Sequence, residues 1–141
     1  MNNQMPRDVG SIQYSLREPF DRAVELVCRS LESKGLRVAG ELDVAKRVER
    51  YVGIVLPPCK IVFVLPGEST LTKSGIHPWS AIFLPLHIVI SNSGGQTEIE
   101  VQNRVQSRPE TAEPAIIGPI VELQTQISSA IEAIAMRPSL V

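Results

Sequence analysis

LPPCKIVFVLPGESTLTKSGIHPWSAIFLPLHIVIS, residues 56–91, is the stretch that decides the fold. It contains two apolar runs, 60–65 and 81–91, separated by a loop rich in Gly, Ser and Thr. Their length and β-branched residues predict two strands, and Pro57 and Pro58 forbid a helix ahead of the first. One of the two cysteines, both histidines and the only tryptophan also lie here. We therefore expect any chemistry of the protein on these strands or between them.

The residues that follow this stretch predict a hairpin and a helix. Asn92-Ser93-Gly94-Gly95 is typical of a hairpin turn, because glycine accepts the positive φ that such turns require. A further strand is expected over 97–105, with one wet face because Glu, Gln and Arg alternate with apolar residues. After a polar connector, a helix is expected over 115–136, with the apolar stripe Ile116, Ile120, Leu123, Ile127, Ile131 and Ile134.

The residues before this stretch complete the pattern. Residues 1–10 are expected to be a disordered leader, and 11–138 a single domain. Within it we expect a strand near 12–16, a helix from 20 to Gly35, a strand from 36 to 42, and a short helix capped by Asp43 and closed by Gly53. The order predicts an α+β fold with two layers: a mostly antiparallel five-stranded sheet, two main helices on one face and one short helix.

Composition excludes several classes of protein. Fourteen basic and fifteen acidic residues nearly cancel and are spread along the chain, so neither nucleic acid nor an anionic membrane is an expected partner. The N-terminus lacks the apolar run of a secretory signal, and no apolar run is long enough to span a membrane. We therefore expect a cytoplasmic protein in which Cys28 and Cys59 are reduced and, without a C-x-x-C unit, form no thioredoxin-type motif.

Five short motifs occur in a familiar order: KGL at 34–36, GELD at 40–43, LPP at 56–58, IVFVL at 61–65 and FLPLHIVI at 83–90. With them, the run from Phe20 to Val101 resembles the prokaryotic family called domain of unknown function 302. The resemblance implies a small two-layer α+β domain, often found as a dimer. It brings no established activity, although it carries an association of some members with haem. LPGEST at 65–70 departs from the G-N-P-type turn that family members often have.

The strongest candidate site is the second face of the sheet. Phe83, His87 and Val89 alternate with Leu84, Leu86, Ile88 and Ile90, so both faces of this strand are apolar. Because helices in a two-layer domain cover only one face, a second copy or a flat prosthetic group must cover the other. The preferred hypothesis is haem b near the interface of a homodimer, in a redox or sensing role. His87 would be the preferred axial metal ligand, His77 a possible second ligand, and Trp79 a wall of the slot.

Other sites and functions stay open at this point. The rival functions are a cofactor-free dimeric interaction module, and a thiol or redox enzyme that uses Cys59 beside Lys60 with an unknown redox partner. Zinc is the lesser metal option, since the spacing of the histidines and cysteines matches no standard site, and covalent haem attachment is excluded because C-x-x-C-H is absent. The loop over residues 67–74 resembles a phosphate-binding loop but lacks the second glycine, so nucleotide hydrolysis is rejected.

Overall fold

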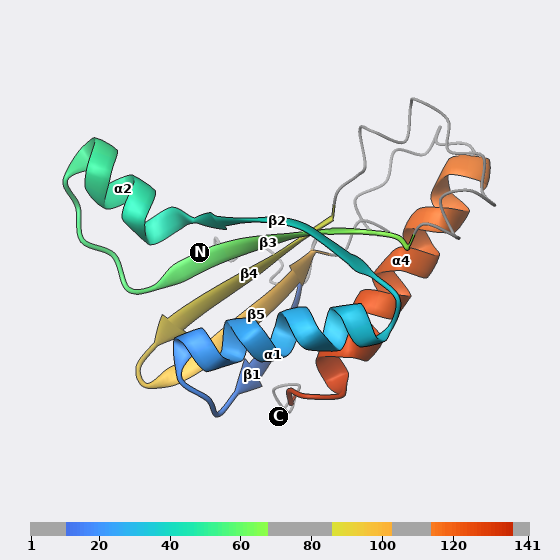
Figure 1. Cartoon of the computed structure of the whole chain (residues 1–141), viewed down its shortest axis with the longest axis horizontal. Coiled ribbons are helices and arrows are strands. Elements are labelled where there is room, and N and C mark those ends of the chain that lie inside the picture. The colour runs from blue at the N-terminus through green and yellow to red at the C-terminus, as the bar shows by residue number, and fades with distance from the viewer. Residues whose placement is uncertain (1–10, 68–85, 103–113, 137–141) are drawn as a thin grey trace, which may run out of the picture.

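Five strands form one antiparallel sheet, with two long helices packed on one of its faces (Figure 1). The structure, a computed structural model, describes residues 11–67, 86–102 and 114–136. Its elements in chain order are β1 (Ser11–Leu16), α1 (Phe20–Ser33), β2 (Arg37–Asp43), α2 (Val44–Val52), β3 (Cys59–Leu65), β4 (Leu86–Ser93), β5 (Gln96–Gln102) and α4 (Pro114–Glu132). The predicted α+β class and the five-stranded sheet are confirmed.

The strand order is β1-β5-β4-β3-β2, and every neighbouring pair is antiparallel. The predicted turn joins β4 to β5, where Gly94 and Gly95 have φ angles of 64° and 87°. Two consecutive positive φ angles match the two-residue hairpin turn whose twist suits flanking strands. The short helix begins at the predicted cap, since Asp43 Oδ1 accepts a hydrogen bond of 2.9 Å from the Lys46 backbone N–H. It ends at Gly53, which has a φ of 78°.

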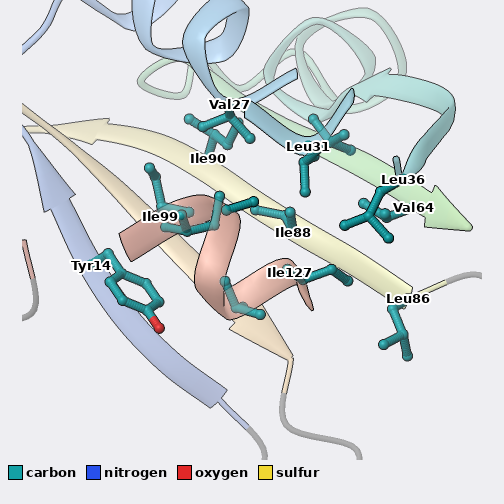
Figure 2. Close-up of a cluster of buried hydrophobic side chains, with 14 of the residues drawn as sticks. Tyr14, Val27, Leu31, Leu36, Val64, Leu86, Ile88, Ile90, Ile99 and Ile127 are labelled. Atoms are coloured by element: carbon teal, nitrogen blue, oxygen red, sulfur yellow. The ribbon is translucent and has the colours of Figure 1, made fainter. Parts of the chain in front are cut away.

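The core lies between the sheet and the helices α1 and α4 (Figure 2). Alternate residues of the central strands point into it, including Val62 and Val64 of β3 and Leu86, Ile88 and Ile90 of β4. The predicted stripe of the last helix supplies the opposite side: Ile120, Leu123, Ile127 and Ile131 are buried, and Ile134 packs against the cluster. The side chain of Ile116, the remaining member of the stripe, lies outside what the structure describes. The apolar alternation of the strands and the helical spacing therefore meet in one contiguous core.

One predicted boundary differs from the structure by several residues. The last helix ends at Glu132 rather than at 136, because the chain turns and Met136 pairs with the β1 edge. Ser15 N donates to Met136 O at 2.9 Å, and Met136 N donates to Ser15 O at 3.0 Å. The described part of the fourth strand begins at Leu86, and the predicted strand residues 81–85 and 103–105, like the predicted leader, lie outside the described residues.

None of the helices in the described ranges is long and apolar enough to cross a membrane. This finding agrees with the absence of a long apolar run in the sequence.

Just after β3, the backbone at Gly67 lies close to the backbone at Gly35, and this contact leads to a prediction. A Cβ atom added at Gly67 would collide with the carbonyl oxygen of Gly35, in the turn between α1 and β2. Backbone cannot yield as a side chain can, so we expect Gly67→Ala to lower the free energy of unfolding by about 1–3 kcal/mol. Urea denaturation followed by circular dichroism measures the change.

Gly40→Ala is the matched control, because a Cβ at Gly40 meets no atom within 4 Å and Gly40 lacks a positive φ. The control should change stability by less than about 1 kcal/mol. An equal effect of the two substitutions would contradict the steric explanation.

Candidate functional site

The outer face of the sheet, which points away from α1 and α4, carries the candidate site. Strand pairing places His87 of β4 directly opposite Phe63 of β3, and Val89 directly opposite Ile61. Residues that face each other across an antiparallel pair point to the same side, with Cβ atoms about 4.5–5.5 Å apart. All four side chains are half-buried. An imidazole and a phenyl ring are thus neighbours on a face that these two helices do not cover.

The apolar surface extends from this pair of strands to the sheet edge. Leu42 of β2 faces Ile61, and Leu65 lies on the same face of β3 as Phe63. We call these residues the outer apolar patch: Leu42, Ile61, Phe63, Leu65 and Val89. Each of them is half-buried, whereas the alternate residues of β3 and β4 are buried in the core.

An acidic strip borders the outer apolar patch. On β5 the inward residues Thr97, Ile99 and Val101 are buried, and Glu98 and Glu100 on the outer face are exposed. Strand pairing sets Glu100 beside Val89 and Glu98 beside Ser91. The outer face therefore changes from apolar over β3 and β4 to acidic over β5.

The structure places part of the site predicted from sequence. His87 and Val89 lie on the predicted face, opposite to Leu86, Ile88 and Ile90. His77, Trp79 and Phe83 lie outside the described residues. Phe63 was not among the predicted site residues, because the alternation of β3 separates Ile61, Phe63 and Leu65 from Val62 and Val64 without showing which set faces outward. What was missing was the strand register, which alone identifies Phe63 as the neighbour of His87.

Metal-binding side chains do not cluster in the described part of the chain. No group of three or more His, Cys, Asp or Glu residues there could hold a metal ion. His87 is the one histidine within these ranges. Any metal bound through His87 therefore needs a ligand from elsewhere or from a prosthetic group.

Glu41 and Asp43 are close in sequence but have separate roles in the structure. Asp43 caps α2, as expected. Glu41 accepts a hydrogen bond from Cys28 Sγ at 3.4 Å and lies 3.9 Å from Lys60 Nζ through its other oxygen. Burial, followed by the hydrogen bond to Glu41, raises the pKa of Cys28 to about 12. Cys28 packs against the core edge and stays protonated at neutral pH.

The surroundings of Cys59 also disfavour its thiolate form. It pairs with Ser91, whereas Lys60 pairs with Ile90 of the core face, so the thiol and the ammonium group point to opposite faces of β3. Burial raises the pKa of Cys59, and the nearby Asp43 carboxylate raises it further. Both effects disfavour the thiolate, which is the nucleophilic form.

Comparisons with known proteins support the fold and the family. The family model described as domain of unknown function DUF302 matches residues 12–134. The structure is similar to the crystal structure of an uncharacterized conserved DUF302 protein from Bacillus stearothermophilus, with a TM-score of 0.76 and 15% sequence identity. The similarity covers 88% of this chain and 97% of that one. The curated proteins contain no match to this sequence. Since the family model spans most of the chain, this protein belongs to the DUF302 family.

Proposed function

We propose that this protein is a non-hydrolytic, dimeric binding protein that holds haem b on the outer face of its sheet. One observation carries the proposal: His87 lies among half-buried apolar side chains, directly across from Phe63, on a face that α1 and α4 leave uncovered. Haem needs an apolar surface for its flat ring and an axial ligand for its iron, for which histidine is a standard choice.

The residues present fit such a group. The outer apolar patch offers aliphatic and aromatic contacts from three strands, and rigid strand backbone holds His87 in place. A second ligand would come from His77, with Trp79 and Phe83 as further contacts. Haem b would supply an iron that changes oxidation state or takes a small ligand, which are the bases of a redox or a sensing role.

A cofactor-free dimeric interaction module is the second candidate. The outer apolar patch favours it as well, since apolar residues gathered on an open sheet face mark protein interfaces. In this case a second copy alone would cover the patch. We place either form in the cytoplasm, with no nucleic acid or membrane partner, in keeping with two free cysteines and a net charge near zero.

Haem titration tests the proposal directly. Adding haemin to the purified protein should produce a shifted Soret band that saturates at one haem per chain. His87→Ala should abolish the shifted band or weaken haemin binding at least ~10-fold, because loss of an axial ligand removes the bond that fixes the iron. Ser91→Ala is the matched control, since Ser91 lies on the same face of β4 but outside the outer apolar patch. It should bind haemin as the unmodified protein does.

Absence of any Soret shift in the unmodified protein would refute haem binding and leave the interaction module. An unchanged spectrum for His87→Ala would contradict the assignment of His87. The same titration of His77→Ala then tests the other predicted ligand.

Alkylation kinetics test the remaining enzyme hypothesis, that Cys59 is a reactive thiol. Because the pKa of both thiols is raised, we expect iodoacetamide to modify each at about pH 8 at least ~10-fold more slowly than a free cysteine peptide. The rate at Cys28 should keep rising beyond pH 9.0, since the pKa of its thiol is about 12. Cys28→Ser and Cys59→Ser leave one thiol each and assign the rates. Modification of Cys59 faster than the free peptide would restore the thiol enzyme.

A further inference from the structure

The segment from α2 to the start of β3 projects from the body of the molecule. We call residues 44–58 the arm; it extends past the end of the sheet, away from α1 and α4 (Figure 1). No residue of α2 is buried. The arm holds most of the strongly exposed large apolar side chains in the described ranges: Tyr51 at 72%, Val52 at 64%, Ile54 at 53%, Val55 at 76% and Leu56 at 39%. A contiguous set of this kind marks a surface built for a partner.

The arm is held in place at both ends. The Asp43 cap fixes its first turn, and Asn92 N donates to Pro58 O at 3.0 Å where the chain rejoins the sheet. Gly53 ends the helix, and Pro57 and Pro58 restrict the backbone of the return. The exposed side chains are therefore presented on an anchored support, which lowers the entropy lost on binding.

The arm and the acidic strip carry opposite charges. Its helix carries three exposed cations, Lys46, Arg47 and Arg50, against the single carboxylate of Glu49. In the described part of the chain these cations form no salt bridge, and Arg50 lies over the Tyr51 ring at 5.8 Å. The acidic strip of Glu98 and Glu100 likewise has no cationic partner there. One copy thus carries both an apolar, basic arm and an apolar, acidic face.

From this complementarity we infer that the arm of one copy docks on the outer face of a second copy, with its apolar residues on Ile61 and Val89 and its cations on the acidic strip. A two-fold axis makes the exchange reciprocal, so each copy gives one arm and receives one. His87 and Phe63 lie one row further along the strands, beside the docked arm. The inference rests on the dimeric part of the proposed function and names the contact that forms the dimer.

The two edges of the sheet are poorly suited to joining two copies of the chain. The β1 edge pairs with Met136 at Ser15. The β2 edge carries a register shift between Val38 and Gly40 and exposes the charged side chains of Arg37 and Glu41. Bulges and charges of this kind protect edges from pairing with another chain. Association through a face and an arm is therefore favoured over a continuous sheet across two copies.

Charge exchange between arm and strip tests the inference in the full chain, purified without haem. Sedimentation velocity over a range of concentrations gives the dimer Kd. The arm reversal (Lys46→Glu, Arg47→Glu, Arg50→Glu) and the strip reversal (Glu98→Lys, Glu100→Lys) should each raise the Kd at least ~10-fold, because like charges then meet at the contact. Combining the two sets in one chain should bring the Kd back toward its original value.

Two further variants complete the experiment. Tyr51→Ser with Val55→Ser should weaken the dimer at least ~10-fold, since an exposed aromatic anchor supplies much of the energy of an interface. Glu122→Lys on α4 is the control, because it reverses one exposed charge away from the outer face and should leave the Kd unchanged. Circular dichroism should show the same fold throughout, since none of the substituted side chains is buried.

The outcomes separate this inference from the proposed function. If neither charge reversal raises the dimer Kd, the docking of the arm is wrong, but the proposal of a dimer still holds. A monomeric unmodified protein would overturn both, whereas the haemin titration is read independently. Monomers that float with vesicles of phosphatidylcholine and phosphatidylglycerol, and lose this binding on arm reversal, would assign the arm to a lipid surface and overturn docking on a second copy.

Discussion

The rest of the structure depends on the burial of one face of the sheet against α1 and α4. Along β3 and β4 each buried residue alternates with a half-buried one, so the core and the outer apolar patch are set by the same alternation. A shift of β3 by one residue would replace Val62 with Phe63 in the core. The same shift of β4 would bring His87 into the core. The packing of the core sets the register of β3 and β4, and this register sets the position of the candidate site. The site needs no separate structural support.

The sequence predicted the elements that carry a local signal. The Asp43 cap, the glycines that close α1 and α2, the Gly94-Gly95 turn and the apolar stripe of α4 are all recognisable within a few neighbouring residues, and the structure contains each of them. Which residues of a strand face the core was also predictable, because the period of a strand is two residues. Together with five short motifs, these signals were enough for the fold class and the family.

What the sequence could not supply depends on contacts between distant segments. The pairing of Phe63 with His87, the Cys28–Glu41 hydrogen bond and the bridge from Ser15 to Met136 join residues whose proximity no local pattern encodes. The arm is the clearest case. The short helix was predicted, but in an isolated sequence its apolar residues are indistinguishable from those of a helix that packs on its own core. Only the structure shows that Tyr51 and Val52 remain exposed.

The place of β1 has a consequence for the order in which the chain can complete its fold. Of the described strands β1 is synthesised first, and yet its sheet partner β5 begins about eighty residues later. Its other edge pairs at Ser15 with Met136, which follows α4. While β5 is still being made, β1 has no neighbour in the sheet, and Tyr14 has nowhere to be buried. The N-terminal strand must therefore wait for the C-terminal third of the chain, which makes sheet closure a late and non-local event in folding.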